Sequence, residues 1–271
     1  MTLRQWLPTL GLTATILLAG CGGGGSATPA APATPSGDGA SAAASAPGGI
    51  YVGFYAEDST SNPEDPTVGA VAINLPAANE PFAGAMYFTY YGCQSENVGH
   101  ISGNKTAATI SGDWSGTLDG YSKNGQFTGT YLDSAHQFKG TYTVTGPKQH
   151  VIIPDCDGEP FDYYIAPNGT FELFPEGAQQ PSTFTVNFND GQIQWTAVSD
   201  AVDGLVYVTD PDKVTAGQNP VLWQAPVSAA MGSYALPEAP LLTAGKSYIA
   251  VVALRKSSGE RAAFASKRFT P

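Results

Sequence analysis

The sequence predicts an all-β chain, in which a glycine-rich antiparallel barrel or strongly curved sheet is followed by a β-sandwich. Between residue 49 and about residue 174, apolar and polar residues alternate in short runs such as "IYVGFYAE" and "FKGTYTVTG". Turn signals separate these runs, which is the pattern of half-buried strands. A short unit that contains glycine recurs in the same region. The last 90 or so residues hold seven further strand-like runs, a number typical of a sandwich.

The N-terminus is typical of a bacterial export signal. Arg4 supplies a short positive region, and residues 6–18 form an apolar stretch that is shorter than the roughly 20 residues of a membrane-spanning helix. The sequence "LAGC" at residues 18–21 resembles the lipobox of bacterial lipoproteins. The resemblance implies that residues 1–20 are removed as a signal peptide and that Cys21 receives a diacylglycerol. The alternative is an ordinary secretory signal with a chance cysteine.

Residues 21–48 are predicted to be the lipidated Cys21 and a disordered tether. The segment consists of Gly, Ala, Pro, Ser and Thr with a single charge, Asp38, and it cannot bury enough apolar surface to fold. The N-terminal lipid would hold the protein on a membrane without spanning it. In the lipoprotein family an Asp after the cysteine favours inner-membrane retention. Because Gly22 stands there, the resemblance implies a lipid-anchored outer-membrane protein that faces the periplasm or the cell surface.

Residues 49–176 are predicted to form the barrel-like domain. The recurring unit is an apolar residue, a spacer, a glycine and usually a small polar residue. Side chains alternate along a strand, so the apolar residue and the glycine share one face. The glycine leaves room for a bulky neighbour or lets the strand bend. Glycines repeated in this way curve a sheet towards a closed barrel. The copies begin at Ile101, Ile110, Trp114, Phe127 and Phe138.

This unit is similar to the glycine-rich hairpins in the β-barrel domains of lipocalin-like and transferrin-binding-protein-like families. The similarity covers about residues 98–145. It implies a barrel but no particular ligand.

Two cysteines remain after Cys21, namely Cys93 and Cys156. An even pair in an exported protein predicts a disulfide. The alternatives are two free buried thiols or a metal-binding pair.

Tyrosines gather around both of these cysteines, and a disulfide would bring the two groups together. Such side chains could line a barrel mouth and stack on a sugar or another flat ligand. The alternative is that they fill the core and rim of the barrel, because tyrosine, with an apolar ring and a polar hydroxyl, is common at the boundary between the core and solvent. The candidate ligand-facing tyrosines are Tyr87, Tyr90, Tyr91, Tyr163 and Tyr164.

Residues 177–182 are predicted to be a linker, and residues 183–271 an immunoglobulin-like sandwich. In "LLTAGKSYIAVVAL", Leu242, Gly245 and Tyr248 are three residues apart, which resembles the tyrosine-corner segment of fibronectin type III domains. The resemblance implies that Trp195 plugs the core and that the Tyr248 hydroxyl bonds to the backbone at the corner. Both roles are structural, and a fold does not define a function.

Composition and motifs limit the function. The net charge of −11, without a Lys/Arg cluster, argues against nucleic-acid binding. The histidines lack metal-ligand spacing, and the acidic stretch at residues 155–159 lacks the distal Glu of a calcium loop. We therefore expect no metal, no cofactor and no catalytic residue.

The function that these observations favour is a membrane-anchored cell-envelope lipoprotein with a non-enzymatic binding or protein-interaction role. Its partner would be an unknown protein or glycan. The alternatives are an envelope glycan-acting enzyme or accessory factor that uses scattered Asp and Glu, and a purely structural envelope protein.

Overall fold

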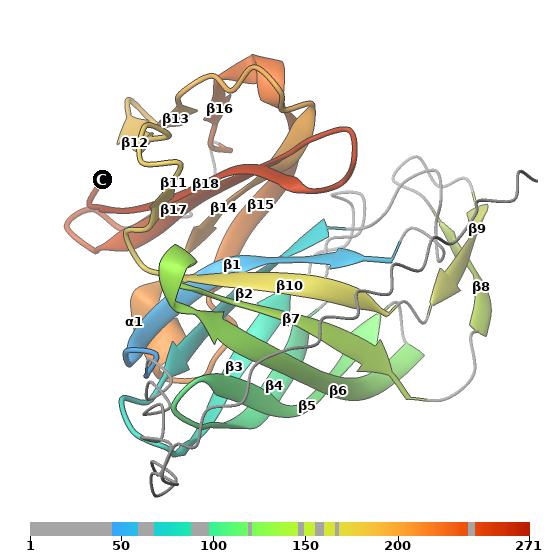
Figure 1. The fold of residues 1–271 in the computed structure, drawn as a ribbon. Helices are drawn as coiled ribbons and strands as arrows, with labels where there is room; N and C mark the ends of the chain where they lie inside the picture. The colour runs from blue at the N-terminus through green and yellow to red at the C-terminus, as the bar shows by residue number, and fades with distance from the viewer. Residues whose placement is uncertain are drawn as a thin grey trace, which may run out of the picture. The chain divides into compact units, whose positions relative to one another are not determined.

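The computed structural model of the chain describes residues 45–58, 68–87, 98–118, 121–145, 149–154, 160–165, 168–237 and 242–271. The predicted all-β class is confirmed, and the first part closes into an eight-stranded antiparallel barrel (Figure 1). Around the barrel the strands follow the order β1-β10-β7-β6-β5-β4-β3-β2. These strands are β1 (Gly49–Glu57), β2 (Val68–Leu75), β3 (Pro81–Tyr87), β4 (Val98–Lys105), β5 (Thr109–Leu118), β6 (Tyr121–Leu132), β7 (Gln137–Val144) and β10 (Gly169–Pro175).

Each barrel strand pairs with the next barrel strand along the chain, and β10 pairs with β1 to close the barrel. Between β7 and β10 the chain forms an additional hairpin. That hairpin pairs β8 (Gln149–Pro154) with β9 (Pro160–Ile165) in a two-stranded sheet of its own. A short 3-10 helix, η1 (Asp133–Ala135), joins β6 to β7.

The glycine units explain how the barrel closes. In each unit the apolar side chain points into the barrel, and the glycine two residues later lies on the same inner side. A Cβ atom built on Gly129 would lie 2.8 Å from the Phe171 ring, and one on Gly140, its partner across the strands, would lie closer still. The glycines therefore provide the space that the large inner side chains occupy.

The interior of the barrel is a packed aromatic core. Tyr51 and Phe138 meet edge to face with ring centroids 5.5 Å apart, and Phe127 and Phe171 do so at 6.2 Å. A cavity of about 30 Å³ remains in the interior beside Phe127 and Phe171, which is room for about one water molecule. The described interior is thus filled by its own side chains.

The C-terminal part contains two further sheets that share a core. The five-stranded sheet has the order β11-β18-β17-β14-β15 and the three-stranded sheet the order β12-β13-β16. Trp195 lies in the core between them and is 7% exposed. The strands are β11 (Gln179–Gln180), β12 (Val186–Asn189), β13 (Gln192–Trp195), β14 (Asp203–Thr209), β15 (Val221–Ser228), β16 (Ser233–Ala235), β17 (Tyr248–Arg255) and β18 (Arg261–Phe269), with α1 (Pro211–Thr215) and η2 (Ala229–Met231) before and after β15.

The other face of the five-stranded sheet packs on the outside of the barrel, over β1, β2 and β10 (Figure 1). The rings of Phe174 on β10 and Phe264 on β18 stack with centroids 3.9 Å apart. The fully buried Tyr207 of β14 donates its hydroxyl to the carbonyl oxygen of Gly53, at 2.8 Å. Barrel and sandwich are therefore joined by a continuous apolar core.

The segment predicted to be a linker takes part in this junction. Residues 179 and 180 form β11, which pairs with Ala265 and Phe264 of β18. The amide of Gly177 donates to Ser266 Oγ at 2.9 Å, and Gln180 Nε2 donates to the carbonyl oxygen of Ala135. The chain thus passes from the barrel to the sandwich through hydrogen-bonded structure.

Candidate ligand-binding face

Most of the predicted lipidation, disulfide and ligand-facing residues lie outside the described part of the chain. This holds for Cys21, Cys93, Cys156, Tyr90 and Tyr91, so the lipidation and the disulfide stay predictions.

The strands of the other three tyrosines are described. Tyr87 ends β3 and pairs with Val98, whereas Tyr163 and Tyr164 lie on β9 and pair with Val151 and His150. A common ligand site for all five tyrosines stays a prediction.

The described residues contain no group of three or more His, Cys, Asp and Glu side chains that could hold a metal ion. Among them there is also no helix that is long and apolar enough to cross a membrane.

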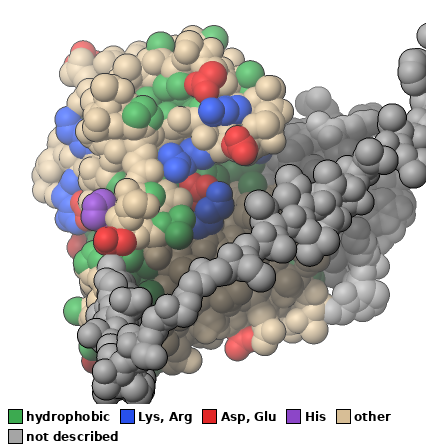
Figure 2. Space-filling model, in the orientation of Figure 1, with side chains coloured by type: hydrophobic (Ala, Val, Ile, Leu, Met, Phe, Trp, Pro, Cys, Tyr) green, Lys and Arg blue, Asp and Glu red, His purple; other side chains and the backbone are tan. Residues whose placement is uncertain are grey.

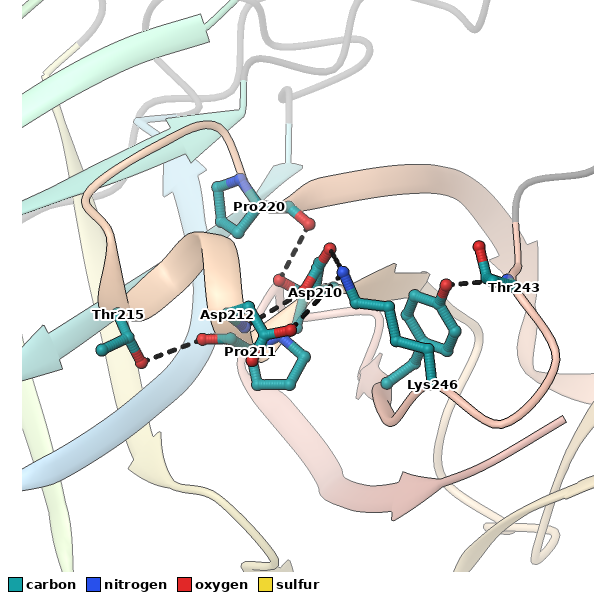
Figure 3. Close-up of polar contacts among 9 residues, drawn as sticks. Asp210, Pro211, Asp212, Thr215, Pro220, Thr243 and Lys246 are labelled. Atoms are coloured by element: carbon teal, nitrogen blue, oxygen red, sulfur yellow. Dashed lines mark hydrogen bonds and ion pairs between the residues drawn. The ribbon is translucent and has the colours of Figure 1, made fainter.

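A charged cluster at α1 has a structural role (Figure 3). The side chain of Asp210 is 4% exposed and caps α1, since its Oδ1 accepts from the Asp212 amide at 3.0 Å. Its Oδ2 accepts from Lys246 Nζ at 2.7 Å, and this hydrogen bond raises the pKa of Lys246. Val214 of α1 is buried in the junction core. The cluster therefore ties α1 to the loop before β17, and Val214 packs the helix against the barrel.

The outer surface of β4, β5, β6 and β7 is an ordered array of short polar side chains, which we call the polar face. All of them are exposed. The barrel was predicted from the apolar and glycine positions of the repeated unit, and the other two positions, which point outward and form this array, were missed. The polar face comprises His100, Ser102, Asn104, Thr109, Ser111, Asp113, Ser115, Asn124, Gln126, Thr128, Thr130, Lys139, Thr141 and Thr143.

The strand register places these side chains in rows across the sheet. Asp113 pairs with Ser102 on one side and with Gln126 on the other, and Gln126 in turn pairs with Thr143. Adjacent strands lie about 4.8 Å apart, and side chains on one face of a strand recur about every 6.8 Å. The polar face therefore presents hydrogen-bonding groups on a regular two-dimensional grid.

Two adjoining open grooves cross the polar face. Their volumes are about 500 and 440 Å³. Asp113 and Gln126 border both grooves, and Gln126 Nε2 lies 3.5 Å from Asp113 Oδ1. The first groove reaches Gly217, which follows α1, and the second extends to Thr141 on β7.

The polar face carries two formally charged side chains, Asp113 and Lys139, and of these Lys139 is paired with a carboxylate. Lys139 at its edge lies 3.3 Å from Glu172, and Glu172 also binds Arg261 Nε at 2.6 Å. On the side of the molecule drawn in Figure 2, basic and acidic side chains lie next to one another. The polar face can thus form hydrogen bonds through neutral hydroxyl and carboxamide groups, with Asp113 as a central acceptor.

Comparisons of the chain with protein-family models, with curated proteins and with solved structures found no match.

Proposed function

We propose that this chain is a lipid-anchored cell-envelope lipoprotein with a non-enzymatic binding role, held on the outer membrane through Cys21. The barrel and sandwich form its binding module, and the polar face is its ligand-binding surface. The observation that carries the binding role is the pair of adjoining grooves, which share Asp113 and Gln126 on a rigid sheet.

The binding surface is well ordered before a ligand arrives. The inner side of the same strands is packed with aromatic rings, and the Trp114 indole donates to the carbonyl oxygen of Thr143 at 3.0 Å. A surface that is rigid in advance loses less entropy when it binds. The anchor and tether are supported by the sequence alone, through the lipobox-like residues 18–21 and the segment up to residue 48.

We also propose that the C-terminal sandwich is fibronectin type III-like, which would make it a docking or spacer module. The amide of Thr243 donates to the Tyr248 hydroxyl at 2.8 Å, which supports the predicted tyrosine corner. The burial of Trp195 supports its role as the core plug.

The membrane anchor is tested by metabolic labelling with an alkyne fatty acid in cells that express the wild-type chain or Cys21→Ser. We expect the wild-type chain to be labelled and to sediment with membranes, and the variant to lose the label. An unlabelled wild-type chain would contradict the anchor. Protease treatment of intact and permeabilised cells then separates surface display from a periplasmic location.

The binding role is tested with a photo-crosslinking amino acid placed at Thr128, in the second groove, or at Gln194, an exposed position on β13. We expect crosslinked adducts in living cells from position 128 and not from position 194. A purely structural envelope protein would give the same result at both positions. An envelope glycan-acting enzyme would turn over its ligand, and the recovered glycan would be shortened.

A further inference from the structure

We propose that the ligand of the polar face is a neutral glycan chain, which lies across both grooves with Asp113 and Gln126 at its centre. This inference rests on the proposed binding function and names the class of its ligand.

The charge of the surface favours a neutral ligand. The whole chain carries a net charge of −11, which repels anionic polymers. Within the polar face, Asp113 and Lys139 are the two formally charged side chains, and Lys139 is paired with Glu172. An anionic polymer would need a cluster of cations, and a basic protein would need several carboxylates. The groups offered instead are hydroxyls and carboxamides.

The chemistry of these groups fits a polyhydroxylated ligand better than a protein. Each hydroxyl and carboxamide can both donate and accept a hydrogen bond, as can each hydroxyl of a sugar. Protein interfaces depend instead on aromatic and arginine anchors. In the row next to Asp113 and Gln126 on the side of the second groove, the outward side chains include Ser111, Thr128 and Thr141. These side chains are short, and threonine is restricted at χ1, so little side-chain entropy is lost on binding.

The layout of the grooves favours an extended ligand. The first groove is lined by Asn124 and Gln126 of β6, and the second by Gln126 and Thr128 of the same strand. The grooves therefore follow one another along the strand direction. From Asn124 to Thr128 the strand rises about 14 Å, which suits an oligomer that contacts both grooves. A polymer would add avidity by offering many equivalent segments to anchored copies of the chain.

The test measures binding of the full chain, purified from membranes in mild detergent, to immobilised polysaccharides. The neutral probes are dextran, amylose, galactomannan and β-1,3-glucan, and the anionic probes are alginate and heparin. The test variant is Gln126→Arg, whose longer charged side chain enters both grooves. The matched control is Gln194→Arg, because Gln194 is also an exposed glutamine in mid-strand, paired with Asn187 and Ser233.

We expect the wild-type chain to bind at least one neutral probe, with Gln126→Arg weakening that binding at least about tenfold and Gln194→Arg changing it less than about twofold. No binding to the neutral probes, binding to anionic probes alone, or equal effects of the two variants would each overturn the proposal. If the neutral probes fail while position 128 still gives specific crosslinks, the binding function stands and the glycan class is wrong. A discrete protein adduct there would identify a protein ligand instead.

Discussion

At the residue scale, two buried polar groups in the described core have opposite effects on stability. The Tyr207 hydroxyl reaches two barrel carbonyl oxygens, that of Gly53 at 2.8 Å and that of Val71 at 3.3 Å. Lys105 is 1% exposed, and within the described part of the chain its Nζ has no hydrogen-bond partner. A satisfied buried group stabilises a fold modestly, whereas an unsatisfied one is costly.

Replacing Tyr207 with Phe should lower the free energy of unfolding by about 1–2 kcal/mol, because a buried donor between barrel and sheet is lost. Urea denaturation at pH 7 measures the change. The matched control is Tyr234→Phe, since Tyr234 is half-buried and its ring packs on Trp223 at 4.9 Å. The control should shift stability by less than about 0.5 kcal/mol. Equal effects of the two variants would contradict a special role for the Tyr207 hydroxyl.

The Tyr207 hydroxyl also predicts a dependence on pH. Burial raises the pKa of Tyr207 above its ordinary value, so the native state keeps a proton that the unfolded state loses above about pH 10. Its contribution to stability is therefore complete below that pH and declines as the pH rises further. The stability difference between wild type and Tyr207→Phe should shrink from pH 9 to pH 11, as measured by urea denaturation. A constant difference would contradict the assignment.

Replacing Lys105 with Met should stabilise the protein by up to about 1 kcal/mol at pH 7, because an amine without a hydrogen-bond partner is removed while the apolar stem is kept. Burial lowers the pKa of Lys105, so the unfolded state holds the proton more tightly. The penalty is complete below the lowered pKa and fades as the pH rises towards about 10.5. The gain from the substitution should therefore fall between pH 7 and pH 10.5 in thermal unfolding. A loss of stability at pH 7 would show that the amine has a favourable partner.

At the scale of elements, the strands that were best predicted from the sequence have one buried face and one solvent-exposed face. The units from Ile101 to Gly140 alternate because their apolar and glycine positions face the barrel core and their polar positions face water. β2 was missed, since Val71 and Ile73 face the barrel core while Ala70 and Ala72 face the C-terminal sheet. A strand that is buried on both faces has a continuous apolar sequence without a period of two.

The helix α1 was also missed, although Asp210 followed by Pro211 is a recognisable start signal. The helix has only five residues, so no helical period could develop. The polar face was present in the sequence as the spacer positions of the repeated unit. Its assembly into rows depends on strand register, which pairs Gln126 with Asp113 and Thr143 and which the sequence pattern alone does not give.

The glycine units make a prediction at this scale. Gly129→Ala should lower the free energy of unfolding by about 1–3 kcal/mol, because the added methyl group would lie 2.8 Å from the Phe171 ring. Combining it with Phe171→Leu should give less than the sum of the two single losses, because the smaller side chain relieves the clash. Chemical denaturation of the wild type, the two single variants and the double variant measures the coupling between the two positions. Additive losses of stability would mean that the added methyl group disturbs the backbone and does not clash with the Phe171 ring.

At the scale of the whole molecule, the barrel and the C-terminal sheets belong to the same compact unit. The sequence predicted a linker at residues 177–182 between two separate domains. The junction could not be seen in the sequence, because contacts such as Phe174 with Phe264 join positions that are distant along the chain. Polar contacts flank the same junction: Arg261 binds Glu172, and Arg268 binds Glu176 with its Nη2 2.7 Å from Oε2.

A shared core predicts that the two parts unfold together. Phe174 is fully buried in the junction core, and Phe174→Ala should cost about 3–5 kcal/mol through lost burial and the cavity left behind. If barrel and sandwich are one cooperative unit, hydrogen exchange should accelerate by a similar factor in β5 and β6 of the barrel and in β17 of the sandwich, because all three open by global unfolding. Faster exchange in the barrel alone would show that the sandwich is stable by itself. In that case the junction would be a docking contact between two domains, and the polar face would owe its rigidity to the barrel alone.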